Sequence, residues 1–203
     1  MPKKILISAF EPFGNDAINP SAEAVGRLEA PDGIELTKVV LPVVWGAAFS
    51  KLSAAWDAFL PDAVLLTGLA GGSDAIRVER LGVNLCGAIR DNFGVGPNGS
   101  AEAPRETPVC AGEPDGIFST FSYEKILAAL KAAGVPCRAS FSAGTYLCNF
   151  VLFSSLVKAK REGNRVKVGF VHVPYCEKQK TDAPFLPIDK ITEALRIAVS
   201  NMI

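Results

Sequence analysis

Two residues of this sequence could together support nucleophilic chemistry: a cysteine at the start of a predicted helix and a histidine at the end of a predicted strand. Cys148 follows the small residues Ala143 and Gly144, where a strand gives way to a helix that we expect to extend to Glu162. Backbone N–H groups at a helix start stabilise a thiolate and could hold an oxyanion. The sequence therefore favours Cys148 as a candidate nucleophile.

The candidate base is fixed by elimination. The chain contains one histidine, His172, so any mechanism that pairs a cysteine or serine with histidine must use it. It lies at the end of the last predicted strand, just before Val173 and Pro174, where a ring can be directed into a cleft. Its imidazole also needs a hydrogen-bond acceptor to fix the tautomer.

Residue types alone leave other interpretations open. A free cysteine in a helix is more often a buried structural residue than a nucleophile, and a lone histidine at a strand end is more often structural or incidental. The glycine-rich segment 68–72 follows a predicted strand, which is a weak signal for a phosphorylase-like or nucleotide-binding protein. Ser73 misses the nucleophile-elbow pattern. One histidine and scattered cysteines offer no metal-ligand pairs, so we expect no metal site.

Composition narrows the class of protein. The 203 residues are 49% hydrophobic and 21% charged, with a formal net charge of zero, which is typical of a globular protein and favours neither nucleic acid nor anionic membrane as a partner. Five cysteines with no CxxC pair indicate reduced thiols in the cytoplasm. The apolar run 5–10 is too short for an export signal, and no segment is long enough to span a bilayer.

Predicted strands and helices alternate along the chain. We expect strands at 4–10, 33–42, 63–67, 76–85, 137–142 and 166–173, and helices at 20–28, 47–60, 122–133, 143–162 and 188–202, with a long irregular segment at 92–116. This order predicts a single α/β domain over 1–203, a three-layer α/β/α arrangement around a mostly parallel twisted sheet.

A parallel sheet places functional groups beyond the carboxyl ends of its strands. We expect the loops after Phe10, after Thr67, around Ser142 and after Val173 to share that edge. Cys148 and His172 lie on or near these loops.

Several segments carry a resemblance to a known family. They are Phe10 to Gly14 with Asn19-Pro20-Ser21, then Gly68 to Gly72, Glu79-Arg80 with Asn84, Ala143 to Asn149, and His172 to Tyr175. In these motifs and their order, the chain resembles the pyroglutamyl peptidase I family, also called pyrrolidone-carboxylate peptidases, over nearly its whole length.

The resemblance implies a cysteine peptidase with a triad of Glu79, Cys148 and His172. Such an enzyme removes an N-terminal pyroglutamyl residue from peptides through a thioester intermediate and needs no cofactor. Glu79 is assigned by the resemblance alone. Prokaryotic members are commonly homotetramers, and the segment 92–116 is a plausible subunit contact.

The resemblance also assigns a substrate pocket. Pyroglutamate carries a neutral five-membered lactam, which needs apolar walls with one donor and one acceptor. Backbone groups of 68–72 would meet the lactam. The side chains expected to bind substrate are Phe10 and Phe13 against the ring, Tyr146 and Leu147 beside the nucleophile, and Asn19, Leu69 and Arg90.

Three positions depart from the family pattern. Leu69 stands where glutamine is common, and Phe150 stands where histidine is common. The segment 88–92 is one residue shorter than usual, which leaves open whether Arg90 replaces the family's arginine. Leu69 and the shortened segment suggest an alternative, a protein of this fold with lost or altered activity that binds a lactam or another blocked N-terminus.

Overall fold

The computed structural model describes residues 2–14, 16–179 and 182–203, and its centre is a six-stranded sheet. The strand order is β2-β1-β3-β8-β4-β7. A separate two-stranded sheet joins β5 to β6. The strands are β1 (Lys3–Phe10), β2 (Ile34–Leu41), β3 (Ala63–Leu69), β4 (Ile76–Glu79), β5 (Leu81–Val83), β6 (Gly116–Phe118), β7 (Cys137–Ser140) and β8 (Lys167–Val173).

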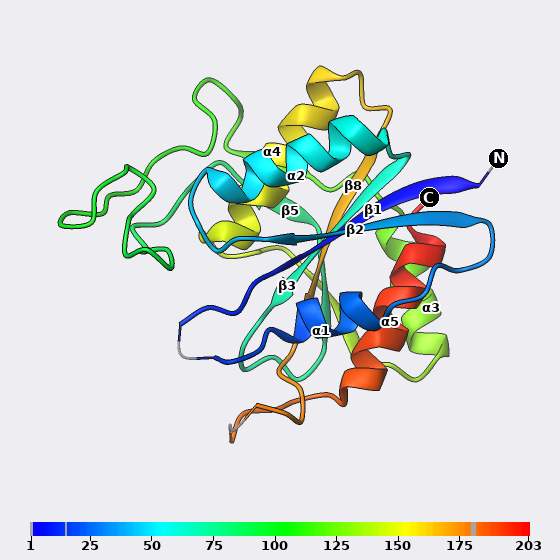
Figure 1. The fold of residues 1–203 in the computed structure, drawn as a ribbon. Helices are drawn as coiled ribbons and strands as arrows, with labels where there is room; N and C mark the ends of the chain where they lie inside the picture. Colours follow the sequence, from blue (N-terminus) through cyan, green and yellow to red (C-terminus); the bar gives the residue numbers. More distant parts are fainter. Residues whose placement is uncertain (1, 15, 180–181) are drawn as a thin grey trace.

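Five helices cover both faces of this sheet (Figure 1). On one face α1, α3 and α5 lie together, and on the other α2 packs beside α4. The helices are α1 (Pro20–Arg27), α2 (Ala47–Phe59), α3 (Tyr123–Ala132), α4 (Leu147–Arg161) and α5 (Ile188–Asn201). The predicted three-layer α/β/α fold is confirmed.

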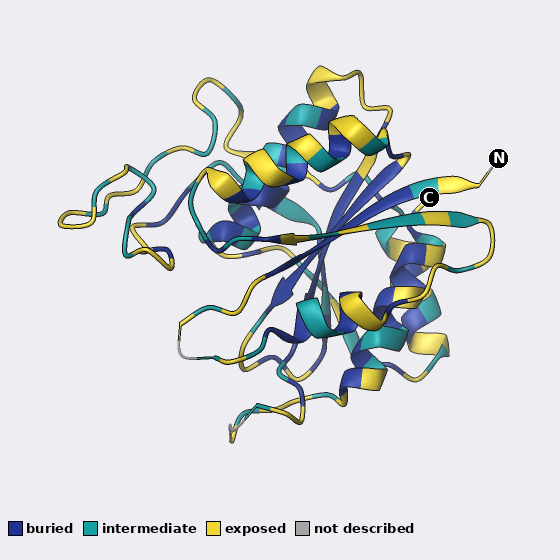
Figure 2. Cartoon of the chain, viewed as in Figure 1, coloured by how far each residue is buried: buried dark blue, intermediate teal, exposed yellow. Residues whose placement is uncertain are grey.

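The strands at the centre of the sheet are buried on both faces because helices cover both (Figure 2). In β1, Ile5 and Ile7 belong to the hydrophobic core with α1 and α5, whereas Leu6 and Phe10 belong to the core with α2 and α4. Alternation along a strand thus divides the apolar residues between two cores. In β8 the side chain of Phe170 faces the α4 side.

Most element boundaries agree with those predicted from the sequence to within one or two residues, because local signals determine where helices and strands begin and end. The side chain of Asn19 caps α1 by accepting a hydrogen bond from the backbone N–H of Ser21, and Pro20 begins the helix. At the end of α2, Leu60 adopts a left-handed conformation with φ of 52°. Pro61 follows it, as expected for a helix stop.

Three expected elements differ in the structure. The expected strand 76–85 is two strands, β4 in the main sheet and β5 in the small one. β3 continues through Gly68 and Leu69, which the sequence assigned to a loop. The expected helix at 143–162 begins only at Leu147, because Gly144 has a positive φ of 77° and Tyr146 is extended.

The sheet is parallel across β2, β1, β3 and β8, but its other edge runs the opposite way. β4 pairs antiparallel with β8, and β7 is parallel to β4. The expectation that the loop around Ser142 shares the carboxyl edge of β1, β3 and β8 is therefore wrong. The segment 141–146 instead connects β7 to α4, and this path brings it to the site described below.

The segment 92–116 has little regular structure, as expected, and extends away from the sheet (Figure 1). Side-chain hydrogen bonds tie its flanks to the body. The amide of Asn84 bonds the backbone of Cys110 and Glu113, and the carboxylate of Asp91 accepts from Trp45, Phe93 and Val95. Within the described ranges, no helix is long and apolar enough to cross a membrane.

Candidate active site

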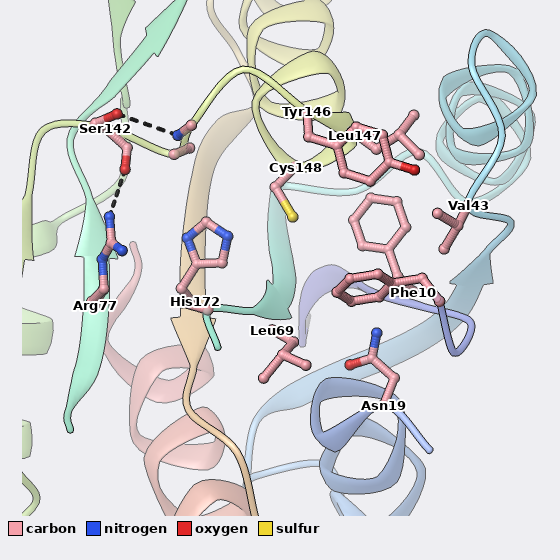
Figure 3. Close-up of a pocket in the computed structure, with 14 residues that line it drawn as sticks. Phe10, Asn19, Val43, Leu69, Arg77, Ser142, Tyr146, Leu147, Cys148 and His172 are labelled. Carbon is pink, nitrogen blue, oxygen red and sulfur yellow. Dashed lines mark hydrogen bonds between the residues drawn. The ribbon is translucent and has the colours of Figure 1, made fainter. Parts of the chain in front are cut away.

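One cavity of about 230 Å³ brings together most of the residues predicted from the sequence. Its wall is mainly apolar. Figure 3 shows Cys148 and His172 directed into the cavity, with Phe10, Val43 and Leu69 to one side and Arg77 and Ser142 to the other. The lining residues are Phe10, Phe13, Asn19, Val43, Leu69, Ala70, Arg77, Ser142, Ala143, Gly144, Tyr146, Leu147, Cys148 and His172.

The nucleophile candidate sits at the start of α4. Cys148 is the second residue of the helix, and its N-cap residue Tyr146 makes no side-chain capping bond. The first N–H groups of a helix have no partner within it, so they remain available to a group in the cavity. The sequence placed Cys148 in the first or second turn of a helix that begins at Ala143. In the structure it lies in the first turn, because the helix begins at Leu147.

The thiol itself is held in its neutral form. Desolvation, followed by the nearby charge of Glu79, raises the pKa of Cys148 from 9.0 to about 12. A backbone hydrogen bond at Cys148 and the charge of Arg77 act in the opposite direction. The sequence predicts a helix start that lowers this pKa, but desolvation outweighs it. Proton removal must therefore come from a base.

His172 and Glu79 form a buried pair. The Nδ1 atom of His172 lies 2.8 Å from Oε1 of Glu79, and the two residues are 5% and 0% exposed. An ionised carboxylate accepts the Nδ1–H, which leaves the lone pair on Nε2 free to take a proton. This is the acceptor that the imidazole was expected to need.

The antiparallel pairing of β4 with β8 creates this contact. Arg77 lies opposite His172, and Glu79 lies opposite Phe170. Residues two apart in a strand share a face, so all four side chains lie on the side covered by α4. Glu79 reaches His172 diagonally across the two strands.

The apolar part of the cavity contains the predicted binding residues. Phe10, Phe13, Leu69 and Leu147 contribute apolar side chains, and Tyr146 packs edge-on against Trp45 with ring centroids 5.4 Å apart. Desolvation raises the pKa of Tyr146 to about 12, so its hydroxyl stays protonated. That hydroxyl donates to the backbone carbonyl of Arg90 over 3.1 Å.

Two predicted binding residues have their polar groups engaged elsewhere. Asn19 lines the cavity, but its amide caps α1 and donates to the backbone carbonyl of Glu11. The guanidinium of Arg90 donates to the carbonyls of Ala101 and Glu102 in the irregular segment and is absent from the cavity lining. The prediction that Arg90 contacts substrate has no support from this geometry.

The cavity is also lined by Arg77, Val43 and Ser142, which were not predicted as site residues from the sequence. The guanidinium of Arg77 lies 3.2 Å from Oε1 of Glu79 and donates to Ser140 Oγ and to the carbonyl of Ser142. Arg77 stands two residues before Glu79, so strand alternation already placed both on one face. The alternation points to Arg77 only after Glu79 has been recognised as a candidate site residue.

The nucleotide-binding alternative is not supported by the geometry. A phosphate loop precedes a helix, whose first N–H groups hold the phosphate. After β3 this chain makes a turn and enters β4 instead. In the part of the chain that the structure describes, no group of three or more histidine, cysteine or acidic side chains could hold a metal ion.

Comparison with known proteins decides the family. Residues 3–203 match the family described as Pyroglutamyl peptidase. The chain belongs to the pyroglutamyl peptidase family. Among its relatives, pyrrolidone-carboxylate peptidase 1 of Photorhabdus laumondii is 39% identical, covering 98% of this chain and 92% of that protein.

Solved structures of pyroglutamyl peptidases share the fold. The crystal structure of pyroglutamyl peptidase I from Bacillus amyloliquefaciens matches with a TM-score of 0.91 at 32% identity, covering 100% of this chain and 95% of that one. A mutant pyrrolidone carboxyl peptidase from Pyrococcus furiosus matches with a TM-score of 0.90 at 33% identity, covering 98% and 97%. The family resemblance inferred from the sequence is confirmed.

Proposed function

We propose that this chain is a cysteine peptidase that hydrolyses the bond after an N-terminal L-pyroglutamyl residue, with Cys148 as nucleophile, His172 as general base and Glu79 orienting the imidazole. The observation that carries the proposal is the buried Glu79–His172 pair at 2.8 Å, whose imidazole lines the same cavity as the Cys148 thiol. The residues 1–203 would act as one catalytic domain.

The first half of the reaction forms a thioester. Nε2 of His172 takes the thiol proton as Sγ of Cys148 attacks the pyroglutamyl carbonyl carbon, and Glu79 stabilises the resulting imidazolium. Backbone N–H groups at the start of α4 would hold the oxyanion. The imidazolium then gives its proton to the departing amine, and the C–N bond breaks.

The second half restores the enzyme. His172 takes a proton from a water molecule that attacks the thioester carbonyl. The C–S bond breaks, the proton returns to sulfur, and pyroglutamic acid leaves. Because burial raises the pKa of the thiol to about 12, the thiol keeps its proton at rest, and the thiolate forms only when His172 takes that proton.

The cavity explains why a lactam would be selected. Its volume of about 230 Å³ suits one small ring better than a nucleotide. Its lining residues include no aspartate or glutamate among the described residues. An ordinary N-terminus would place its ammonium there without a counter-charge, next to the cationic Arg77, at a cost of several kcal/mol.

The test is release of aminomethylcoumarin from its pyroglutamyl amide under reducing conditions. We expect the wild type to release the fluorophore and Cys148→Ser to abolish release. Glu79→Gln should lower kcat by about 10²-fold or more, because the imidazole loses its orienting charge. Release by Cys148→Ser at the wild-type rate would refute the assignment of the nucleophile.

If the wild type released no aminomethylcoumarin, the peptidase proposal would be refuted. In that case, stabilisation of the protein by 2-pyrrolidone would indicate a lactam-binding protein, the alternative suggested by Leu69. Prolyl aminomethylcoumarin is the matched control substrate, because it keeps the five-membered ring but has a protonated amine in place of the lactam. We expect no release from it.

We further propose a homo-oligomer, by family resemblance a tetramer, in the cytoplasm. The irregular segment 92–116 exposes 78% of Phe93, and Phe118 beyond it is 57% exposed, which supports a contact there. All five cysteines are free, as a reducing compartment would keep them. Light scattering coupled to size exclusion tests the assembly, and a monomer at micromolar concentration would refute it.

A further inference from the structure

Besides His172, Glu79 has a second basic neighbour, Arg77, which the triad does not include. Its Oε1 atom lies 2.8 Å from Nδ1 of His172 and 3.2 Å from Nη2 of Arg77. Glu79 is 0% exposed, and Oε2 has no hydrogen-bond partner among the described residues. One oxygen of a buried carboxylate is therefore shared between an imidazole and a guanidinium.

A buried carboxylate needs a compensating positive charge. Two groups can supply it: His172 by taking a proton, or Arg77, which is always charged. Among residues with described side chains, these two alone are within ion-pair distance of Glu79. If Arg77 provides the charge, His172 can remain neutral, and only a neutral imidazole can act as the base.

Arg77 is also held in place on the nucleophile side. Its Nε and Nη2 atoms donate to Ser140 Oγ at 3.3 and 2.8 Å, and Nη2 donates to the carbonyl of Ser142 at 2.6 Å. Ser140 ends β7 and Ser142 lies in the segment that leads to α4. The same guanidinium thus connects the acidic member of the triad to the backbone that precedes Cys148.

We propose that Arg77 is a positioning residue that keeps Glu79 ionised and His172 neutral in the resting enzyme. The inference rests on the proposed function, because it takes His172 to be the general base. The charged groups around the imidazole come from two elements, Glu79 and Arg77 on β4 and the Cys148 thiol on α4. On its other side β3 presents Gly68 and Leu69, which do not titrate.

This arrangement determines in which direction the loss of Arg77 should shift the protonation of His172. Removing Arg77 leaves the imidazole as the remaining source of positive charge for Glu79, so the protonated form of His172 is favoured. Less neutral base is then present at a given pH. The acidic limb of the kcat/KM profile, which reports the base of the free enzyme, moves to higher pH.

Arg77→Gln is the decisive variant, and Arg77→Lys is its conservative partner. We expect Arg77→Gln to move the acidic limb upward by about one pH unit. Arg77→Lys keeps the positive charge, so the acidic limb should stay at the same pH as in the wild type. Its kcat can still fall, because the bonds to Ser140 and Ser142 are lost. Arg138→Gln is the control for net charge, because Arg138 on β7 binds Asp74 and Ser73 outside the cavity.

The single histidine allows a direct measurement that needs no activity. The NMR signal of the imidazole Hε1 proton belongs to His172 alone, and its titration should shift upward in Arg77→Gln and remain in place in Arg138→Gln. An unchanged His172 titration in folded Arg77→Gln, or a kcat/KM loss equal at every pH, would overturn the inference. A wild type that titrates as expected without cleaving pyroglutamyl substrates would instead count against the proposed function.

Discussion

At the scale of single residues, desolvation affects the pKa of the candidate nucleophile more strongly than the helix on which it lies. Cys148 lies in the first turn of α4, where the helix dipole favours a thiolate. Desolvation nevertheless raises the pKa of the thiol to about 12. The thiol should therefore rest in its protonated, neutral form.

This resting state predicts how Cys148 reacts with iodoacetamide. Only the thiolate is alkylated, so the rate constant at Cys148 should rise about tenfold per pH unit between pH 7 and pH 10. Mass spectrometry of the peptide that contains Cys148 measures the rate site by site. A rate that is constant from pH 6 to pH 9 would instead reveal a preformed thiolate–imidazolium pair and contradict the prediction.

At the scale of elements, β3 must pass close under the nucleophile. A Cβ atom added to Gly68 would lie 2.8 Å from Sγ of Cys148 and 3.0 Å from Cζ of Phe170. Phe170 is fully buried, whereas the Cys148 thiol borders the cavity, so an added methyl group would push the thiol toward the cavity. A glycine at this position therefore allows the helix to bring the thiol down to the sheet.

Gly68→Ala should displace the thiol. We expect a loss of at least about tenfold in kcat/KM, together with a destabilisation of about 1–3 kcal/mol from overpacking. Gly26→Ala in α1 is the matched control, since its added Cβ meets no atom within 4 Å. That variant should retain activity and gain roughly 0.5–1 kcal/mol, because alanine favours a helix over glycine. Wild-type kinetics in Gly68→Ala would refute the close contact.

Asn149 fastens α4 to the segment that follows Glu79. Its Nδ2 donates to the carbonyls of Val83 and Leu85, its Oδ1 accepts from the N–H of Val83, and the residue is 0% exposed. The side chain next to the nucleophile thus fixes the helix to β5. Its three hydrogen bonds all go to backbone groups that helices and strands leave unpaired.

Asn149→Ala should destabilise the protein by about 2–4 kcal/mol, because three partly buried backbone groups lose their partner. Urea unfolding followed by circular dichroism measures the change. Asn201→Ala, at the C-terminal end of α5, removes a single part-buried bond to the carbonyl of Ile197 and should cost less than about 1 kcal/mol. An equal loss of unfolding free energy in the two variants would contradict the prediction that the three bonds of Asn149 stabilise the protein more than a single bond does.

At the scale of the whole molecule, the buried thiol links stability to pH. Burial raises the pKa of Cys148 from 9.0 to about 12 in the folded state, so between these values the folded chain keeps a proton that the unfolded chain releases. The contribution is complete below pH 9 and is lost as pH rises toward 12. Deprotonation of Cys148 in alkaline solution therefore lowers the free energy of unfolding of the protein.

The stability of the wild type should fall more steeply than that of Cys148→Ser above pH 9. We expect a difference of roughly 1 kcal/mol in the free energy of unfolding between pH 9 and pH 10. Urea titrations of both proteins at pH 8, 9 and 10 measure it, and groups common to both cancel. Parallel stability curves would contradict the raised pKa.

The sequence by itself predicted most of the elements and the layers, and it favoured Cys148 and His172 as candidate catalytic residues. Periodic apolar residues and caps such as Asn19 and Pro20 act over a few residues, so they can be interpreted locally. His172 followed from its uniqueness and Cys148 from its place at a helix start. The family was identifiable because its motifs occur in order, and Glu79 came from that resemblance alone.

Only the tertiary structure decided how these residues meet. The direction of β4 depends on pairing with β8, a strand some ninety positions later, and no local pattern encodes it. That reversal places Glu79 beside His172, brings in Arg77, and turns the loop around Ser142 away from the expected edge. The neutral state of Cys148 likewise depends on packing, since desolvation is a property of everything that surrounds the sulfur.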